Sequence, residues 1–584
     1  MNLTTLVDIF QAVVKHDLPN AMAHRVDGKW QNISAKEVER RTLNCAHQLK
    51  EWGFAKGDRA AIISENRPEW AIADFAVEWL GGVDVPIYPT LTADQVQYIL
   101  RDSGSRIAFV STLEQLRKVL SVAEHTYLEK IIVMETLDDD LLRDGVFSMS
   151  EIAGHPAKER VLQSPISPDD LATIIYTSGT TGTPKGVMLT HGNITSNIVA
   201  STNTFEWSNK QGFISFLPLS HITARHLDYV MLATGIGISY CSSFEELPKM
   251  LVEVRPANFV AVPRVYEKTR KEAERRASTG IKKMIFEWAR EVGKAYRAQI
   301  MAGTVPSSFR WRLADALVFS KVRAGLGGRI ECCISGGAPL GLETAEWFAD
   351  IGIRIFEGYG LTETSPVIAI NTAKAIKLGT VGKPLPNVEC KIAEDGELMV
   401  RGPSVTRGYW NLPQETTNSF DNGWFKTGDI GSIDPEGFLS ITDRKKDLLK
   451  TSGGKLIAPQ PIENALKNDA LVAQATVIGD KRKFIAVIIA PNFQLLEEWA
   501  RANSIMSNSR TELIANQKVQ QLYDNIVSSV NKKLAHFETL KKTVLVPDEF
   551  TIASGEITPS LKLKRRVVEK KYASLIDAVY ADTH

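Results

Sequence analysis

The sequence predicts an α/β protein. A large N-terminal domain of parallel α/β subdomains, with a small antiparallel β subdomain, should precede a smaller mobile α+β C-terminal domain. Within residues 59–110, short apolar segments alternate with amphipathic ones, which is typical of a parallel sheet covered by helices. From about residue 379, short apolar segments separated by turn residues indicate antiparallel strands. The chain of 584 residues is too long for one hydrophobic core, so several subdomains are expected.

The predicted elements of the N-terminal part follow one another in a regular order. The expected strands are RAAIIS (59–64), GVDVPIY (82–88) and RIAFV (106–110), and the helices between them are PEWAIADFAVEWL (68–80) and TADQVQYILRDS (92–103). The alternation resumes over 171–260, and again at RIECCISGG and IRIFEGYG. Glycines gather at the carboxyl ends of these strands, where ligands bind in open α/β sheets.

The chain changes character again near residue 443. The segment DRKKDLLKTSGGK (443–455) is charged and contains adjacent glycines, which favours a hinge. An α+β region follows it, with a helical insert around 493–540. No internal repeat or low-complexity tract is found along the sequence.

Composition and charge argue against several classes of protein. The net charge of +1 gives no general affinity for nucleic acid, and no nucleic-acid partner is expected. The first twenty residues lack a basic start followed by an apolar run, so no signal peptide is expected. The longest charge-free apolar stretch, 229–244, is too short to span a bilayer.

Cysteine usage indicates a reducing compartment. Five cysteines without CxxC spacing predict reduced thiols and a cytoplasmic protein. The adjacent Cys332 and Cys333 could form a redox pair, but we interpret them as small apolar residues that end a buried strand.

A loop rich in Gly, Ser and Thr, YTSGTTGTPKGV (176–187), follows the strand-like segment ATII. Successive backbone N–H groups in such a loop form a nest for an anion, and the hydroxyls and Lys185 add donors and positive charge. Phosphate is therefore the expected ligand, and a solvated turn is the alternative. The loop is not a Walker A motif, because Gly186 rather than Ser or Thr follows Lys185.

Five further motifs accompany this loop, and together they resemble a known superfamily. They are SGGAPL (335–340), GYGLTET (358–364), TGD (427–429), DRKKDLLKTSGGK (443–455) and TPSLKLKR (558–565). Their content and order are similar to those of the adenylate-forming (AMP-binding) superfamily, and to its long-chain fatty acyl-CoA synthetase branch. Such enzymes join a carboxylate to the α-phosphate of ATP, release pyrophosphate and then acylate a thiol.

The resemblance implies three catalytic residues. Lys562 should bridge the carboxylate and the α-phosphate, since Lys562-Leu-Lys-Arg565 fits the Lys-x-x-Arg frame of the family better than Lys564 does. Thr362 should donate to the α-phosphate. Glu363 should hold Mg²⁺, with Thr181 as a second ligand or near neighbour, because this hard cation takes oxygen ligands.

The resemblance also implies where the nucleotide binds. The loop should cradle the β- and γ-phosphates, two glycine-bearing segments should enclose adenine with Tyr359 stacked on the ring, and the ribose hydroxyls should meet a carboxylate beside an arginine. The residues implied are Thr177, Ser178, Gly179, Thr180, Thr181, Gly182, Thr183 and Lys185 for the phosphates, Gly336, Gly337, Ala338, Gly358, Tyr359 and Gly360 for adenine, and Asp429 and Arg444 for ribose.

The implied division of labour is between two domains. An N-terminal AMP-binding domain (1–443) should hold ATP and the acid, and a C-terminal lid (447–584) should rotate about a hinge (444–446) with Lys446 as the pivot. Because Lys562 belongs to the lid, the lid must close for adenylation. It must then swing away so that Ser452, Gly453 and Gly454 can guide CoA.

The segment FLPLSHITARHLDYVML (216–232) resembles the LPLxH element of the branch, which implies that His221, Thr223 and Ala224 line the acyl pocket. His221 is interpreted as pocket wall, since the chemistry needs no proton abstraction from a carboxylate. The sequence departs from the family where Ala224-Arg225 replaces an acidic residue followed by arginine.

Residues 264–330 carry sixteen Lys or Arg against six Asp or Glu, interleaved with aromatic residues. This basic amphipathic composition suggests peripheral contact with anionic lipid, and an ordinary solvated helical face is the alternative.

The function predicted is an ATP-dependent fatty acyl-CoA synthetase that uses a medium-to-long-chain acid, Mg²⁺ and CoA. An acyl-AMP ligase that loads a carrier protein is one alternative. A nucleotide-binding regulatory protein is another, although such a protein would be expected to lack Lys562 or Glu363.

Overall fold

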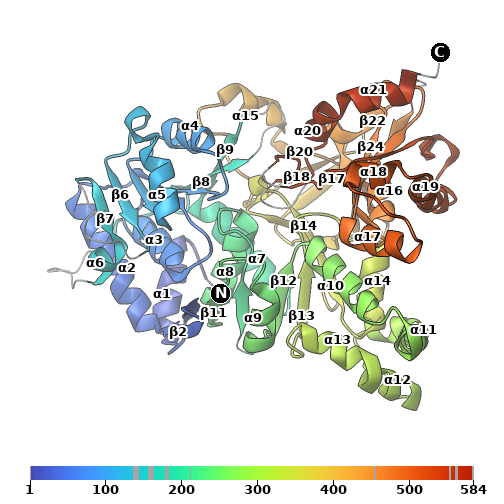
Figure 1. The fold of residues 1–584 in the computed structure, drawn as a ribbon. Coiled ribbons are helices and arrows are strands. Elements are labelled where there is room, and N and C mark those ends of the chain that lie inside the picture. Colours follow the sequence, from blue (N-terminus) through green and yellow to red (C-terminus); the bar gives the residue numbers. More distant parts are fainter. Residues whose placement is uncertain are drawn as a thin grey trace.

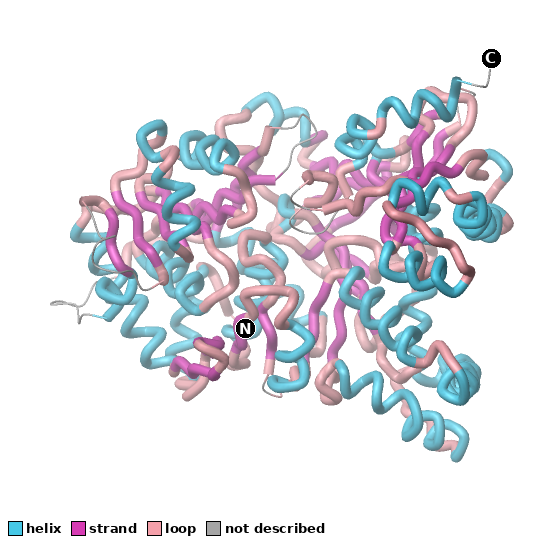
Figure 2. The backbone as a smooth tube through the Cα atoms, viewed as in Figure 1, coloured by secondary structure: helices cyan, strands magenta, loops and turns pink. Residues whose placement is uncertain are grey.

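The computed structural model describes residues 2–135, 144–154, 163–177, 183–208, 210, 212–452, 455–551, 554–558 and 563–581. Two large sheets lie side by side in the N-terminal part, and the C-terminal part, orange to red in Figure 1, lies at one end of them. The strands of each sheet run together through the interior with helices around them (Figure 2). The predicted α/β class is confirmed.

The first large sheet has seven strands among the described residues, in the order β7-β6-β5-β3-β4-β8-β9. All neighbours pair in parallel except β8 and β9. The strands are β3 (Arg59–Ile63), β4 (Val83–Ile87), β5 (Ile107–Val110), β6 (Lys130–Val133), β7 (Val146–Ser148), β8 (Leu171–Thr177) and β9 (Lys185–Thr190). Strand β4 is buried along its whole length, as expected where helices cover both faces of a parallel sheet.

The second large sheet has nine strands among the described residues, in the order β16-β15-β14-β13-β12-β10-β11-β1-β2. Its middle is parallel and each end is an antiparallel extension. The strands are β1 (Met22–Val26), β2 (Lys29–Ile33), β10 (Phe213–Ser215), β11 (Ile238–Tyr240), β12 (Asn258–Ala261), β13 (Cys332–Ser335), β14 (Ile355–Gly360), β15 (Val367–Ile370) and β16 (Lys383–Pro384). Cys332 and Cys333 are buried, free thiols at the start of β13 rather than at the end of a strand.

Helices cover both sheets, and local sequence signals fix several of their ends. Thr92 and Gln95 form a capping box that starts α4, and Gly104 ends it in the left-handed conformation. The helices are α1 (Leu6–His16), α2 (Ala35–Glu51), α3 (Pro68–Trp79), α4 (Ala93–Ser103), α5 (Leu113–Leu120), α6 (Met149–Gly154), α7 (His191–Thr204), α8 (Ile222–Ala233), α9 (Leu247–Val254), α10 (Pro263–Arg276), α11 (Gly280–Met301), α12 (Phe309–Ala314), α13 (Ser320–Gly325) and α14 (Leu342–Asp350).

The predicted antiparallel region lies between the large sheets and the C-terminal part. It contains β17 (Glu389–Ile392), β18 (Glu397–Arg401), α15 (Pro413–Ser419), β19 (Phe420–Asp421), β20 (Trp424–Ile433) and β21 (Leu439–Arg444). All strand pairs in this sheet are antiparallel, which confirms the change of texture expected from about residue 379.

The C-terminal part has its own hydrophobic core around β24 and β25. The predicted helical insert is confirmed as α17, α18 and α19, which lie in sequence between β25 and β26. The elements are β22 (Leu449–Lys450), β23 (Leu456–Ile457), α16 (Pro459–Lys467), β24 (Val472–Ile478), β25 (Ala486–Pro491), α17 (Phe493–Ala502), α18 (Arg510–Ala515), α19 (Gln517–Asn531), β26 (Thr543–Leu545), α20 (Arg565–Lys571) and α21 (Ala573–Ala581).

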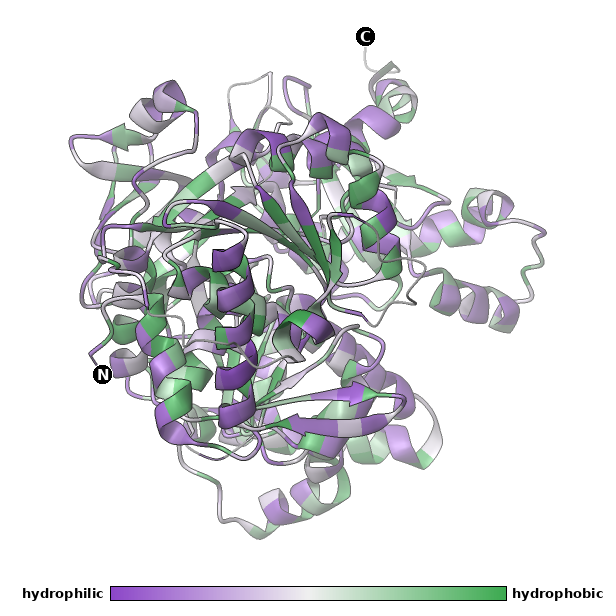
Figure 3. Cartoon of the chain, turned by 90° about the vertical axis from the view of Figure 1, so that its left-hand side faces the viewer, coloured by the Kyte–Doolittle hydropathy of each residue, from purple (hydrophilic) through white to green (hydrophobic). Residues whose placement is uncertain are grey.

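The interior is apolar, and hydrophobic segments run along the central strands (Figure 3). Among the described residues, no helix combines the length and the apolar character needed to cross a lipid bilayer.

A buried ionic network is the main exception to this apolar interior. Arg225 of α8 has no exposed surface, and its Nη2 donates to Asp74 Oδ1 of α3 at 2.9 Å. Its Nη1 lies 3.0 Å from Asp84 Oδ2 of β4 and donates to Thr173 Oγ1 of β8, also at 3.0 Å. The Tyr229 hydroxyl completes the group by donating to Asp74 Oδ2 at 2.6 Å. The network therefore ties a helix of the second sheet to three elements of the first.

The network around Arg225 contains more carboxyl groups than cations. Glu78 is also buried, and burial together with Asp74 and Asp84 raises its pKa well above the ordinary value. Burial raises the pKa of Asp84 to about 7 despite the neighbouring guanidinium. The raised pKa of Glu78 reflects the cost of adding another negative charge here, and Arg225 is the cation that makes the charge of Asp74 and Asp84 tolerable.

We expect Arg225→Met to lower the free energy of unfolding by about 3–5 kcal/mol, because it leaves buried carboxylates without their partner. The folded-state pKa values of these carboxyl groups are already raised in the wild type, to about 7 for Asp84, and removal of the cation should raise them further. The deficit should then grow as the pH rises from about 6 to about 8. Denaturant titration at several pH values measures it. Arg276→Met, which breaks the exposed pair with Glu272, should cost at most about 1 kcal/mol at any of these pH values.

Candidate active site

The segments predicted to hold a nucleotide meet at the carboxyl ends of β13 and β14. The segment 336–340 follows β13, and the residues Gly358, Tyr359 and Gly360 end β14. Strands β20 and β21 bring Asp429 and Arg444 to the same place, since the two residues are paired opposite each other in the sheet. This edge is where open α/β sheets bind ligands.

Tyr359, Asp429 and Arg444 form one hydrogen-bonded group. The Tyr359 hydroxyl donates to Asp429 Oδ2 at 2.6 Å, and Arg444 Nε lies 3.2 Å from Asp429 Oδ1. Asp429 is 3% exposed, whereas the Arg444 side chain is 43% exposed. Burial and the adjacent carboxylate raise the pKa of Tyr359 well above its ordinary value. A carboxylate has about four acceptor positions, so Asp429 retains capacity for further donors.

Glu363 lies in a second group, about Tyr409. Glu363 and Thr362 belong to a short 3₁₀-helix (Thr362–Thr364) directly after β14, and Thr362 is buried. The Tyr409 hydroxyl donates to Glu363 Oε1 at 2.9 Å, and the Thr406 N–H donates to the Glu363 main-chain oxygen at 2.8 Å. These contacts hold Glu363 at the carboxyl end of β14, next to the segments predicted to bind the nucleotide.

Lys185 lies near the ring of the same tyrosine. Its ammonium lies 5.5 Å from the centre of the Tyr409 ring and donates to Glu415 of α15. Tyr409 thus links the end of the Gly-rich loop to Glu363. The sequence analysis identified Lys185 and Glu363 but missed Tyr409 and Glu415, for which the sequence offers only an aromatic residue and an acid in a polar stretch.

Two glycines of the predicted adenine segments, Gly337 and Gly360, occupy positions where a side chain is disfavoured. Gly337 has a φ of +81°, in the left-handed region. A Cβ on Gly360 would lie 1.8 Å from the Pro366 carbonyl oxygen, so no larger residue fits there. Gly336 and Gly358 are not restricted in this way, since the nearest atoms to a Cβ built on them lie at 3.6 Å and 3.5 Å, ordinary van der Waals distances.

A buried acid supports these segments. Glu357 of β14 is 7% exposed, and its Oε2 accepts a hydrogen bond from the Leu340 N–H at 3.3 Å. Burial raises the pKa of Glu357 to about 8, so the carboxyl is largely protonated at pH 7. The sequence analysis did not single out this residue, because a strand-end glutamate next to the motif gives no sign of its burial.

The residues predicted to form the hinge lie directly after Arg444, beside the group that it forms with Tyr359 and Asp429. Lys446 lies in a 3₁₀-helix (Lys445–Asp447) after Arg444, and burial with the nearby guanidinium lowers its pKa. Lys445 forms ion pairs with Asp395 at 2.6 Å and Glu397 at 2.7 Å. The Ser452 N–H donates to the Arg482 oxygen at 2.9 Å.

Of the residues predicted to bind the phosphates, to guide CoA or to catalyse adenylation, only some lie within the part of the chain that the structure describes. Thr177 ends β8 and Thr183 precedes β9, so both flank the loop. Outside the described residues lie Ser178, Gly179, Thr180, Thr181, Gly182, Gly453, Gly454 and Lys562.

The predicted acyl-pocket residues begin α8. His221 is the N-cap residue, and its Nδ1 accepts a hydrogen bond from the Thr223 N–H at 3.2 Å. Ala224 is buried, and the next residue, Arg225, belongs to the ionic network described above. At this motif the acidic residue of the family is replaced by Ala224, and the acidic partners of Arg225 come instead from α3 and β4.

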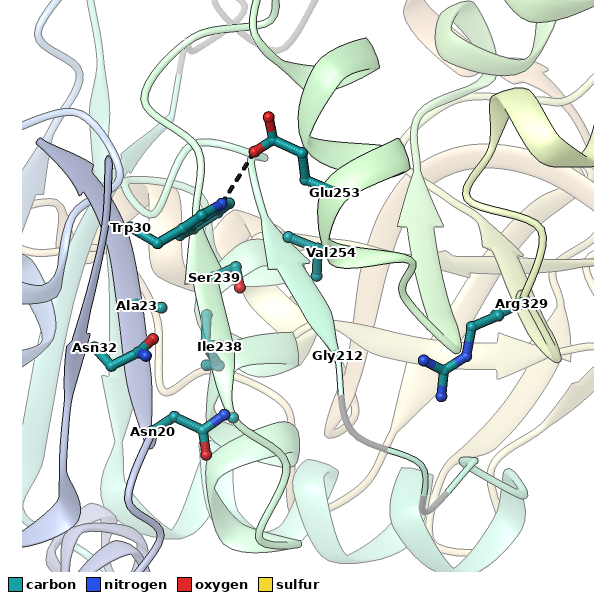
Figure 4. A pocket seen from close by; sticks show the side chains of 11 residues that line it. Asn20, Ala23, Trp30, Asn32, Gly212, Ile238, Ser239, Glu253, Val254 and Arg329 are labelled. Carbon is teal, nitrogen blue, oxygen red and sulfur yellow. Dashed lines mark hydrogen bonds between the residues drawn. The ribbon is translucent and has the colours of Figure 1, made fainter. Parts of the chain in front are cut away.

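A cavity of about 320 Å³ lies elsewhere, between the β1–β2 hairpin and the amino ends of β10 and β11 (Figure 4). Trp30 and Glu253 flank it and are joined by a 3.0 Å hydrogen bond. Gly212 and Gly237, which precede β10 and β11, also line it. It is therefore at the opposite edge of the sheet from the predicted site, and none of the predicted residues contributes to it.

Comparison with known proteins adds independent information. The family model of the AMP-binding enzyme matches residues 11–410, and that of the AMP-binding enzyme C-terminal domain matches residues 446–584. Long-chain-fatty-acid--CoA ligase FadD15 of Mycobacterium tuberculosis is 36% identical over 562 residues, covering 95% of this chain and 93% of the relative. Long-chain-fatty-acid--CoA ligase ACSBG2 of Xenopus laevis is 32% identical over 619 residues, covering 99% and 84%.

Solved structures share the fold. The A domain of carboxylic acid reductase from Segniliparus rugosus, in complex with AMP and a co-purified carboxylic acid, superimposes with a TM-score of 0.77 at 21% identity, covering 99% of this chain and 94% of that one. ATP-bound MatB from Rhodopseudomonas palustris gives 0.72 at 22% identity, covering 98% and 100%. At these identities the likeness concerns the fold.

The buried Glu357 generates a pH-dependent prediction. Glu357→Gln should match the wild type in stability near pH 5 and exceed it increasingly as the pH rises, with the full difference reached near pH 8. The folded-state pKa is raised to about 8 from an ordinary 4.5, so the stability that Glu357 contributes is present at low pH and is lost as the pH rises through this window. The glutamine side chain does not ionise between about pH 5 and pH 9, so the variant does not lose this stability.

The measurement is the free energy of unfolding of both proteins between about pH 5 and pH 9. Exposed Glu114→Gln serves as the control and should differ from the wild type by the same small amount at every pH. A pH-independent difference for Glu357→Gln would mean that Glu357 is ionised in the folded protein.

Proposed function

The chain belongs to the AMP-binding enzyme family, and from this premise we propose that it is an ATP-dependent fatty acyl-CoA synthetase acting on a medium-to-long-chain acid. The observation that carries the proposal is the joining of Tyr359, Asp429 and Arg444 at the same strand edge as Glu363. Relatives named as long-chain ligases, more than 30% identical over nearly the whole chain, support the substrate class.

Asp429 and Arg444 would bind the ribose. The carboxylate is held by the Tyr359 hydroxyl on one oxygen and faces the guanidinium on the other, so its orientation is fixed before a ligand arrives. Two vicinal hydroxyls can donate to the acceptor positions that remain on it. The exposed part of Arg444 stays available to the nucleotide, and Tyr359 would carry the adenine ring.

The phosphates and the acid are both anions, so their approach requires cations and donors around them. Lys185 would supply one charge to the β- and γ-phosphates after leaving Glu415, and Thr362 would donate to the α-phosphate. Lys562 would bridge the α-phosphate and the carboxylate during attack. Pyrophosphate then leaves, and the acyl-adenylate remains between the two domains.

Glu363 fits the requirements of a Mg²⁺ site. It is an oxygen donor at the end of the nucleotide edge, and the Tyr409 hydroxyl contacts one oxygen of its carboxylate. Mg²⁺ is usually held by one or two carboxylates together with substrate phosphates. When bound, the ion would offset phosphate charge, and Thr181 would be its second ligand or neighbour.

We also propose the division into an AMP-binding domain (1–443), a hinge (444–446) and a lid (447–584). One observation supports this division. Lys445 forms ion pairs with Glu397 of β18 and with Asp395, which precedes β18, and these pairs hold the start of the proposed hinge to the N-terminal domain. Lys446 would act as the pivot. After adenylation, rotation would withdraw Lys562 and present Ser452, Gly453 and Gly454 to CoA.

The proposed setting is the cytoplasm with peripheral contact at the membrane, and the proposed partners are fatty acid and CoA. The thiols that the structure describes are unpaired, which suits a reducing compartment. Pyrophosphate release and thioester formation across a panel of acids, with and without CoA, test the function. Adenylation of fatty acids without transfer to CoA would favour a ligase that loads a carrier protein.

Lys562→Ala should reduce acid-dependent ATP–pyrophosphate exchange by at least about a hundredfold, since the lysine contacts both anions while they react. Thioester formation from preformed acyl-adenylate should remain within about twofold of the wild type, because the anions are by then joined. Lys564→Ala is the matched control and should retain both half-reactions. Equal loss of the two steps in Lys562→Ala would remove it from adenylation.

Glu363→Gln should raise the Mg²⁺ concentration needed for half-maximal adenylation by about tenfold or more, because it removes charge from the metal site with little change of shape. Tyr409→Phe removes the hydrogen bond to Glu363 but keeps the carboxylate charge, so it should give a smaller shift. Activity titrations with Mg²⁺ measure both. An unchanged Mg²⁺ requirement in Glu363→Gln would exclude the residue from the metal site.

A further inference from the structure

The helical segment 309–325 is apolar on two opposite sides. It comprises α12, a π-helical turn (Asp315–Phe319) and α13, in direct succession. Trp311, Ala314, Val318 and Phe319 face inward and are buried, with the Trp311 and Phe319 rings 5.0 Å apart. This inner side accounts for the packing of the helix on the protein.

The outer side carries a second line of large apolar side chains. Phe309, Leu313 and Leu317 recur every four residues and are 78%, 40% and 39% exposed, and Val305 just before them is 80% exposed. We call these four residues the exposed stripe. α12 lies at the lower corner of the molecule, away from the C-terminal part (Figure 1). Contiguous exposed apolar side chains of this size mark interaction sites.

Cations border the stripe. At 100° per residue, Arg310 and Arg312 project on either side of Phe309 and Leu313. Arg310, Arg312 and Lys321 are exposed, and no ion pair engages them within the part of the chain that the structure describes. Arg323 is neutralised by Asp315 at 2.6 Å. The segment therefore presents three uncompensated positive charges around an apolar line.

We propose that the exposed stripe inserts into the interfacial region of a bilayer containing anionic lipid. An apolar line flanked by Arg and Lys is the arrangement with which a helix lies in the plane of a membrane surface. The positive charges select an anionic headgroup, each adding about 1 kcal/mol, or roughly a fivefold gain in partitioning. The stripe is one side chain wide, whereas a stable protein interface needs about 800 Å² from each partner.

The value of such contact to the enzyme rests on the proposed function. A long-chain acid partitions into the same apolar layer, so a protein held there meets it at high local concentration. The membrane contact itself is carried by the stripe and its cations, and it is tested without any substrate.

The test is sedimentation of the full-length protein with vesicles of phosphatidylcholine, with and without phosphatidylglycerol. The wild type should bind the anionic vesicles, and less so as salt is raised. Phe309→Ser with Leu313→Ser should reduce the bound-to-free ratio at least about tenfold. Arg310→Gln with Arg312→Gln should reduce it on the order of twentyfold and weaken the dependence on anionic lipid, with Lys321 as the remaining cation beside the stripe.

The control variant removes exposed apolar side chains that lie outside the exposed stripe. Met506 and Tyr127 are 94% and 62% exposed, and Met506→Ser with Tyr127→Ser should bind vesicles as the wild type does. Circular dichroism of all variants, together with their adenylation of a soluble acid without vesicles, should be unchanged. Failure of adenylation in every protein would count against the proposed function and leave the vesicle result intact.

Two results would overturn the proposal. One is vesicle binding that the stripe and arginine variants leave unchanged. The other is a wild type that is dimeric by light scattering and becomes monomeric on Phe309→Ser with Leu313→Ser, which would make a second copy of the chain the occupant of the stripe.

Discussion

The placement of α8 depends on one buried guanidinium. Arg225 is the point at which the second large sheet, through α8, is ionically joined to α3, β4 and β8 of the first. A buried charge is tolerable only with partners in good geometry, so the positions of Asp74, Asp84 and Thr173 constrain that helix. His221 begins the same helix, and β8 runs from Thr173 to the start of the Gly-rich loop. The network therefore fixes the expected acyl-binding element relative to the expected phosphate-binding element.

In the candidate site, too, charged groups are held in position by partners from other elements of the fold. Two tyrosine hydroxyls, those of Tyr359 and Tyr409, orient the two carboxylates on which nucleotide binding would depend. Each tyrosine comes from a different element than its carboxylate, so the geometry exists only when β14, the segment near 409 and β20 are assembled. Preorganisation of this kind matters because a carboxylate that must reorient on binding loses affinity.

Much of the fold was predictable because the required signals are local. Strand–helix alternation over 59–110, the change to antiparallel strands after about 379 and the helical insert near 493–540 all follow from periodicity and turn residues, and the structure confirms them. Tyr409, Glu415 and Glu357 were missed for the opposite reason. Nothing in the neighbouring sequence of these residues records the distant group that they contact.

The sequence by itself determined which groups are available for chemistry: a loop rich in Gly, Ser and Thr that is predicted to bind an anion, a carboxylate after a glycine-bearing strand, and a lysine near the C-terminus, in an order that resembles one superfamily. Only the tertiary structure decided which groups meet. It made Arg225, the residue after the departure at Ala224, a buried cation shared by α3 and β4. It also left Phe309, Leu313 and Leu317 exposed within the basic segment 264–330, for which the sequence had left open both lipid contact and an ordinary solvated face. The reason is physical: burial, pKa and pairing depend on distances through space, and residues far apart in the chain set those distances.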